Sequence, residues 1–421
     1  MRFKPFHAIL ATLVVAGCGG SSVTSPLPSP VPIPAEAVKL AYEFAGTEGQ
    51  SIKPEAPLLY HDGLLYGTTP LTWTQHPDEC CGTVFSVKTD GSGFAMLHRF
   101  GTGSLGRADG AHPRAGLIWF DGRVWGTTSN GGRGCGLQGG CGVVFGVDPA
   151  GKNKIEYYQF KGGSDDGAYP YSRLLAYNGD LYGTTVNGGS NRCGTDGCGT
   201  IFRLRPSDGS EKIVWNFDGK HGAYPFSGLT RIGNRLYGTT ANGGDACGGN
   251  GCGVVYSFDP ADGTYHVVYR FHGNDGDLPK GEVAEVGPSN SPALVGTTVR
   301  GGHANAGVLY EISTQGQPIS SVSLDGGAGG AYPYGALIVE NGRAYGTTEG
   351  GANGCGTIGC GTVFSWSIGK EFDVLYRFGG GSDGQWPRAG LVLAGGNLFG
   401  TTRYGGKQCS VGCGAVFYLT P

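Results

Sequence analysis

One tripeptide, Gly-Thr-Thr, recurs seven times along this chain of 421 residues. Successive copies are 59, 57, 55, 58, 50 and 54 residues apart, and they begin at Gly67, Gly126, Gly183, Gly238, Gly296, Gly346 and Gly400. Internal repeats of about 20–50 residues are typical of solenoids and propellers, in which each copy buries its apolar face only against the next copy. The repeat therefore limits the fold to a stack or a ring of small, near-equivalent units.

Each repeat contains four strand-like segments. In the copy at residues 169–217, the turns Asn178-Gly179 and Asp208-Gly209 each separate two apolar runs. Asn-Gly and Asp-Gly are strong hairpin signals, because both central residues of a tight hairpin turn need a positive φ. Two hairpins in series predict a four-stranded antiparallel sheet, which is one blade of a β-propeller.

The two ends of the repeat region complement each other. Residues 38–44 resemble a fourth strand with no preceding three, and the chain stops just after a third strand at residues 414–419. We therefore expect the N-terminal strand to complete the C-terminal blade, which closes a ring and leaves no blade incomplete. The predicted fold class is all-β: a seven-bladed β-propeller of four-stranded antiparallel blades over residues 37–421.

Composition supports this prediction and excludes one class of partner. The chain has 84 glycines, together with 19 phenylalanines, 6 tryptophans and 21 tyrosines. Glycine without aromatic residues would indicate disorder, but here the aromatic residues recur inside each repeat. The net charge is −3 and no block of lysine or arginine occurs, so a nucleic-acid partner is not expected.

The N-terminus has the composition of an export signal. A basic start is followed by the apolar residues 6–15, which are too few to span a bilayer. The sequence Val-Ala-Gly before Cys18 resembles a bacterial lipobox, so we expect a signal peptide at residues 1–17 and lipidation at Cys18. The alternative is an ordinary signal peptide that happens to end near a cysteine. Residues 18–36, rich in serine and proline, suit an extended tether.

These features predict the protein's location. We expect an exported protein of the bacterial cell envelope, held in the outer membrane by its lipid anchor and facing either the periplasm or the cell surface. We expect it to be a monomer.

Twelve further cysteines form six local pairs in the loops between second and third strands. The pairs are Cys80/Cys81, Cys135/Cys141, Cys193/Cys198, Cys247/Cys252, Cys355/Cys360 and Cys409/Cys413. Local pairs in an exported chain predict disulfides, whereas zinc would need four ligands and each loop offers two thiols. The adjacent Cys80 and Cys81 form either a displaced pair of the same kind or a strained vicinal disulfide.

A proline precedes each first strand, and a carboxylate often stands four residues before it. The prolines are Pro54, Pro113, Pro170, Pro225, Pro279, Pro333 and Pro387. The pattern Asp-Gly-x-x-Pro either forms an Asx-turn or places carboxylates around one mouth of the ring, where they would bind a cation or sugar hydroxyls. Its recurrence favours the structural interpretation. No cofactor is expected, and Ca²⁺ is the alternative.

The residues that flank these prolines are the candidate ligand contacts. First strands line the central channel of a propeller, so one of the two flanking positions is expected to face the channel mouth. Aromatic side chains there would suit a carbohydrate or peptide ligand. The alternative is that these rings pack between blades. The candidates are His112, Arg114, Tyr169, Tyr224, Tyr332, Trp386 and Arg388.

The repeated segments Leu-Tyr-Gly-Thr-Thr, Cys-Gly-Thr-Val-Phe and Leu-Tyr-Arg-Phe resemble the bacterial GloVer tandem repeats over residues 38–421. The strand plan is also similar to kelch-type propellers, although Gly-Thr-Thr replaces the kelch Gly-Gly. The resemblance implies an exported, surface-anchored β-propeller, and it transfers no catalytic residues.

Two classes of function fit these features. The first is a binding or adhesion module that presents its loop face to a glycan or a protein. The second is a propeller enzyme, of lyase or lactonase type, that uses the channel mouth. Acid–base chemistry would then fall to His112, His221 or Glu55. No nucleophile elbow, zinc-protease motif or phosphate loop is present. A scaffold inside an envelope assembly is a third possibility without a direct sequence signal.

Overall fold

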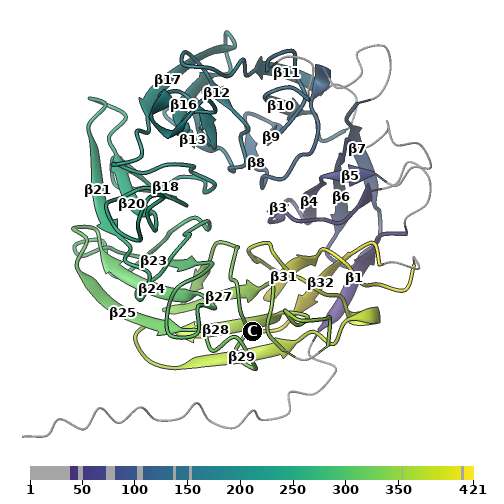
Figure 1. The fold of residues 1–421 in the computed structure, drawn as a ribbon. Helices are drawn as coiled ribbons and strands as arrows, with labels where there is room; N and C mark the ends of the chain where they lie inside the picture. Colours follow the sequence, from purple (N-terminus) through teal and green to yellow (C-terminus); the bar gives the residue numbers. More distant parts are fainter. Residues whose placement is uncertain are drawn as a thin grey trace, which may run out of the picture. The chain divides into compact units, whose positions relative to one another are not determined.

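The computed structural model describes residues 38–45, 51–72, 81–101, 108–135, 139–150, 154–352, 354–408 and 412–421. Within these ranges seven four-stranded antiparallel sheets are arranged in a ring (Figure 1), which confirms the predicted seven-bladed propeller. The proposed signal peptide, Cys18 and the tether lie outside the described residues. A search of the described helices finds none with the length and apolar character needed to cross a membrane.

The strands take equivalent places in every blade. The innermost strands are β3 (Leu59–His61), β8 (Ile118–Phe120), β13 (Leu175–Tyr177), β18 (Thr230–Ile232), β22 (Ala284–Val286), β26 (Ile338–Glu340) and β30 (Val392–Ala394). The second strands are β4 (Leu64–Thr69), β9 (Arg123–Thr128), β14 (Asp180–Thr185), β19 (Arg235–Thr240), β23 (Ala293–Thr298), β27 (Arg343–Thr348) and β31 (Asn397–Thr402).

The outer half of each blade is a second hairpin. The third strands are β6 (Thr83–Lys88), β10 (Val143–Val147), β16 (Thr200–Arg205), β20 (Val254–Phe258), β24 (Val308–Ser313), β28 (Thr362–Ser367) and β32 (Ala415–Leu419). The outermost strands are β7 (Ala95–Arg99), β11 (Lys154–Gln159), β17 (Ser210–Asn216), β21 (Tyr265–Arg270), β25 (Pro318–Ser323), β29 (Phe372–Arg377) and β1 (Lys39–Glu43). Short ladders, such as β2 (Ser51–Ile52) with β5 (Leu71–Thr72) and β12 (Gly167–Ala168) with β15 (Asn187–Gly188), join the loops.

The ring closes where the two ends of the repeat region meet. β1 pairs antiparallel with β32, with Lys39 opposite Tyr418 and Glu43 opposite Ala415. Figure 1 shows β1 beside β32 at the edge of the last blade. The predicted closure by the N-terminal strand is therefore confirmed.

The hydrophobic core is divided among the interfaces between neighbouring blades. The described residues form seven buried clusters, one at each interface. One of them joins Ile201 and Tyr182 of the third blade to Leu236 and Tyr256 of the fourth. Since these clusters lie between blades, each blade buries its apolar residues against two neighbours.

The Gly-Thr-Thr motif has an architectural role at these interfaces. A Cβ atom on Gly67 would lie 2.5 Å from Cζ of Phe85, so glycine makes room for the aromatic residue of the third strand. The first threonine donates its hydroxyl to the next blade, as Thr184 Oγ1 does to the carbonyl of Ser227 at 2.9 Å. The glycine of the motif thus leaves room for an aromatic ring within the blade, and its first threonine links the blade to its neighbour by a hydrogen bond.

Disulfide bonds close four of the loops between second and third strands, as predicted. They join Cys135 to Cys141, Cys193 to Cys198, Cys247 to Cys252 and Cys355 to Cys360. Cys413 is also disulfide-bonded, and its expected partner Cys409 lies outside the described residues. Cys81 is buried, and its expected partner Cys80 lies outside them as well, so the nature of this pair stays a prediction.

Candidate functional site

The residue before each repeated proline has an unusual backbone. All seven have φ between 54° and 59°, in the left-handed region that side chains other than glycine rarely adopt. Hydrogen bonds explain this conformation: the N–H of Tyr169 donates to the carbonyl of Cys141 in the preceding blade at 2.8 Å, and its own carbonyl accepts from Val186 N–H at 3.1 Å. The backbone at this position therefore links two blades by a hydrogen bond, and we call it the clasp position.

The side chains at the clasp position lie against the loops of the preceding blade. The hydroxyl of Tyr224 donates to the carbonyl of Cys193 at 3.3 Å, and the indole N–H of Trp386 donates to the carbonyl of Gly359 at 3.0 Å. Nδ1 of His112 is 2.9 Å from the carbonyl oxygen of Pro70. Tyr169 and Tyr332 pack beside interface clusters. These five candidate residues are separate from the lining of the axial cavity described next.

The residue after each proline faces the axis of the ring. Together these residues line a cavity of about 230 Å³. They precede the innermost strands, so the cavity opens on the face that carries the disulfide loops. Arg114 and Arg388 were predicted as ligand contacts and Glu55 as an acid–base candidate, whereas the other four were not selected, although the same proline spacing marks them. The seven residues are Glu55, Arg114, Tyr171, Phe226, Lys280, Tyr334 and Arg388.

An ion pair forms the floor of this axial cavity. Arg173 Nη2 lies 2.6 Å from Glu282 Oε2, and Arg173 Nε lies 3.2 Å from Glu282 Oε1. The pair connects the third blade to the fifth, and Gly228 of the fourth blade makes this possible because its Cβ would lie 2.1 Å from Glu282 Oε1. Both residues also line a second cavity of about 450 Å³ among the innermost strands. The ion pair therefore lies where the two cavities meet.

The wall of the axial cavity carries an excess of positive charge. Glu55 lies 2.7 Å from both Arg114 and Arg403, and Glu349 lies 2.6 Å from Arg388. The residues that line the cavity carry four cationic side chains and two carboxylates: Arg114, Arg173, Lys280 and Arg388 against Glu55 and Glu282. Since the whole chain has a net charge of −3, the cavity differs in sign from the molecule around it.

Aromatic rings surround the lysine in this wall. Lys280 Nζ lies 4.4 Å from the ring centroid of Phe226 and 5.5 Å from that of Tyr334. Burial lowers the pKa of Lys280 below its usual value of 10.5, and the charges of Arg388 and Arg300 lower it further. Tyr171 extends the aromatic wall, with its ring centroid 5.4 Å from that of Phe226.

The carboxylates of the Asp-Gly-x-x-Pro pattern bind the outermost strand. Asp166 accepts hydrogen bonds from Tyr158 Oη at 2.8 Å and from the N–H of Lys161 at 2.7 Å. Asp275 and Asp383 accept the equivalent tyrosine hydroxyls at 2.7 and 3.0 Å. These contacts favour the structural interpretation of the pattern. Within the described ranges, no three His, Cys, Asp or Glu side chains are grouped as a metal site would require.

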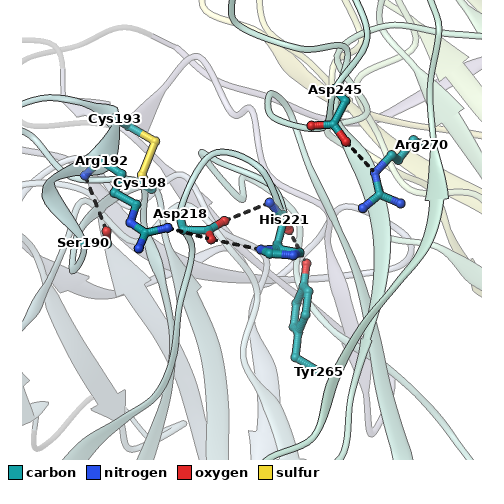
Figure 2. A network of polar contacts seen from close by, with 9 residues as sticks. All are labelled: Ser190, Arg192, Cys193, Cys198, Asp218, His221, Asp245, Tyr265 and Arg270. Carbon is teal, nitrogen blue, oxygen red and sulfur yellow. Dashed lines mark hydrogen bonds and ion pairs between the residues drawn. A yellow bond between two sulfur atoms is a disulfide. The ribbon is translucent and has the colours of Figure 1, made fainter.

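The fourth blade departs from this pattern, as Figure 2 shows. His221 takes the place of the aspartate, and Asp218 supplies the carboxylate: its Oδ1 accepts the N–H of His221 at 2.8 Å and its Oδ2 lies 2.9 Å from Nδ1. The hydroxyl of Tyr265 donates to the carbonyl of His221, and Arg192 lies 3.4 Å from Asp218. Of the three acid–base candidates, His112, His221 and Glu55, the axial cavity is lined by Glu55.

A half-buried carboxylate on the outermost strand β17 predicts a pH-dependent stability. Burial, with the nearby charge of Asp166, raises the pKa of Glu211 from 4.5 to about 7. The folded protein therefore holds a proton that the unfolded chain releases, so the free energy of unfolding should fall as pH rises from 4.5 to 7, by at most about 3 kcal/mol from this site. Urea unfolding at pH 5 and pH 8 tests this.

Substitution separates this effect from the rest of the titration. Glu211→Gln should reduce the difference in stability between pH 5 and pH 8, and Glu285→Gln, at an exposed position, should leave it unchanged. An identical pH profile for wild type and Glu211→Gln would contradict the assignment.

Comparison with known proteins agrees with this architecture. A family model described as a Gloeobacter/Verrucomicrobia repeat matches residues 31–250 and 192–360. A comparison with curated proteins found no match.

The solved structures that match include three with low similarity to this chain. An oligogalacturonate lyase in complex with manganese has a TM-score of 0.48 and 10% identity, covering 91% of this chain and 90% of its own. A putative 6-phosphogluconolactonase from Bacteroides fragilis has a TM-score of 0.47 and 14% identity, covering 80% and 88%. A nidogen/laminin complex has a TM-score of 0.38 and 12% identity, covering 63% and 78%. On the family match and the seven repeated blades, the chain belongs to the Gloeobacter/Verrucomicrobia repeat family.

Proposed function

We propose that the protein is an exported, lipid-anchored binding module that holds a glycan in the axial cavity at the mouth of the ring. One observation supports this most directly. The repeat is nearly uniform at its glycines, threonines and prolines, yet the residue after each proline varies, and these varied side chains converge on one cavity. Side chains that differ from blade to blade create a single asymmetric site out of a symmetric scaffold.

The composition of the wall suits a sugar. Tyr171, Phe226 and Tyr334 offer apolar ring faces, and charged side chains stand between them. Sugars bind to such surfaces through their C–H faces and their hydroxyls. The cavity is small and concave, which fits one sugar residue or a chain end better than the broad surface that a protein partner buries.

The disulfides indicate an oxidising, non-cytoplasmic compartment. That location supports export, and the sequence before Cys18 supports lipid anchoring. A tethered module in the envelope would meet glycans of the cell surface or of the surroundings.

A glycan array probed with soluble residues 37–421 tests the proposal. Replacing Phe226 with alanine should weaken binding at least about tenfold, because buried aromatic contacts dominate such sites. Tyr171→Ala should weaken it as well. Tyr60→Ala is the matched control, since Tyr60 lines the second cavity. Binding that is unchanged by both Phe226→Ala and Tyr171→Ala would contradict the placement of the site in the axial cavity. An array on which no glycan binds would contradict the proposal that the ligand is a glycan.

A propeller enzyme of lyase or lactonase type is the second candidate. The observation in its favour is the lowered pKa of Lys280 inside the axial cavity, because an amine that deprotonates more easily can act as a base. Incubating the protein with each glycan that binds and analysing the products by mass spectrometry separates the two functions: an unchanged glycan supports a binding module, and cleavage supports an enzyme.

A further inference from the structure

We propose that the ligand of the axial cavity is an acidic sugar whose carboxylate is bound between Lys280 and Arg388, beside the ring of Tyr334. This inference rests on the proposed glycan-binding function and specifies its ligand class. It follows from four features of the wall: a lysine without an ion-pair partner among the described residues, a fixed guanidinium, the uneven distribution of charge and the adjoining aromatic faces.

Lys280 is the cation of the wall that lacks a carboxylate partner among the described residues. Arg114, Arg173 and Arg388 each lie within 2.7 Å of a glutamate oxygen, whereas the described contacts of Lys280 Nζ are the rings of Phe226 and Tyr334. Partial burial makes an unpaired ammonium costly. An anion placed beside Nζ would remove that cost, which is a reason for the site to select a charged ligand.

Arg388 is held in position before any ligand arrives. Its Nε donates to Oε1 of the buried Glu349 at 2.6 Å, and its guanidinium carbon lies 4.9 Å from the ring centroid of Tyr334. A guanidinium has five N–H donors, so four are left after this bond. A planar guanidinium fixed on one side matches a carboxylate better than a flexible lysine would alone.

The positive charge is concentrated on one side of the cavity. Glu55 is shared by Arg114 and Arg403, so one of these two positive charges is offset. Near Lys280, by contrast, Arg388 and Arg300 act on the same ammonium against the single carboxylate of Glu349. The geometry places the adjoining ring faces of Tyr334 and Phe226 where they can contact the sugar that bears the carboxylate.

The experiment compares two forms of one oligosaccharide by isothermal titration calorimetry. The first is an oligosaccharide of uronic acids, and the second is the same oligosaccharide with its carboxylates reduced to alcohols. We expect the soluble domain to bind the acidic form at least about tenfold more tightly, as one charge-assisted contact implies. Lys280→Met should weaken binding of the acidic form about 10- to 100-fold and leave the neutral form unaffected.

A matched variant and a second ligand make the result decisive. Lys220→Met removes the same charge from an exposed loop of the same face and should not change the Kd. Thermal unfolding of Lys280→Met verifies that the variant is folded. Equal Kd values for the acidic and reduced forms, or an unchanged Kd in Lys280→Met, would overturn the carboxylate site while Phe226-dependent binding would still support the proposed function.

A sulfated oligosaccharide provides the last comparison. Tight binding of the sulfated sugar without binding of the uronate would overturn the carboxylate as the recognised group. If none of these sugars binds and the glycan array is also empty, both the inference and the proposed function fail.

Discussion

Replacing Phe44 with alanine is expected to lower the free energy of unfolding by about 3–5 kcal/mol, the cost of removing a buried phenylalanine. Phe44 is 2% exposed, and its ring lies edge-on to Phe85 of the first blade with centroids 5.3 Å apart. Its N–H donates to the carbonyl of Gly414 in the last blade at 3.1 Å. One residue therefore connects the first and last blades, at the place where the ring closes.

Chemical denaturation of the soluble domain measures this effect. Lys39→Ala is the control, because Lys39 lies on β1, the strand that Phe44 directly follows, with an exposed side chain, and should change stability by no more than about 0.5 kcal/mol. If Phe44→Ala proves as mild as Lys39→Ala, the closure would contribute little to stability, and the ring would hold together through the other six interfaces.

Replacing Glu55 with glutamine is expected to cost about 3 kcal/mol, the lower end of the effect of removing one partner from a buried ion pair. Glu55 Oε2 lies 2.7 Å from Arg114, in the second blade, and Glu55 Oε1 lies 2.7 Å from Arg403, in the last. Its side chain is 8% exposed, and those of the two arginines are 32% and 24% exposed. Glutamine keeps the shape of the side chain but leaves two arginines without their counter-charge.

Urea unfolding again provides the measurement, with Glu371→Gln as the control. Glu371 is exposed, so its loss of charge should be nearly neutral. Equal effects of the two substitutions would show that the contact among three blades behaves as an ordinary surface ion pair. A larger effect for Glu55→Gln assigns part of the ring's stability to the same residues that line the axial cavity.

Much of the fold followed from local pattern. The Asn178-Gly179 turn, the cysteine spacing and the unpaired segment at residues 38–44 each specify a neighbour only a few residues away or a missing member of a repeat. Such features can be recognised in a sequence because hairpins, short disulfide loops and blade order depend on short-range geometry. The blade number, the closing strand and four disulfides were therefore predicted correctly.

The ligand site was only partly accessible to the same reasoning. The sequence indicated the residues on either side of each proline as ligand contacts. Most of the candidates selected were aromatic residues before the proline, such as Tyr224 and Trp386. The structure shows that this position is a clasp with positive φ, which turns its side chain toward the preceding blade. The next residue, such as Phe226 or Lys280, faces the axis instead.

The sequence by itself thus determined how many blades there are, how they close and where the variable positions occur. Only the tertiary structure decided which of these positions meet. The direction of a side chain beside the proline depends on hydrogen bonds to another blade, and the Arg173–Glu282 floor joins residues 109 positions apart. No local spacing encodes such contacts, because they exist only once seven blades surround a common axis.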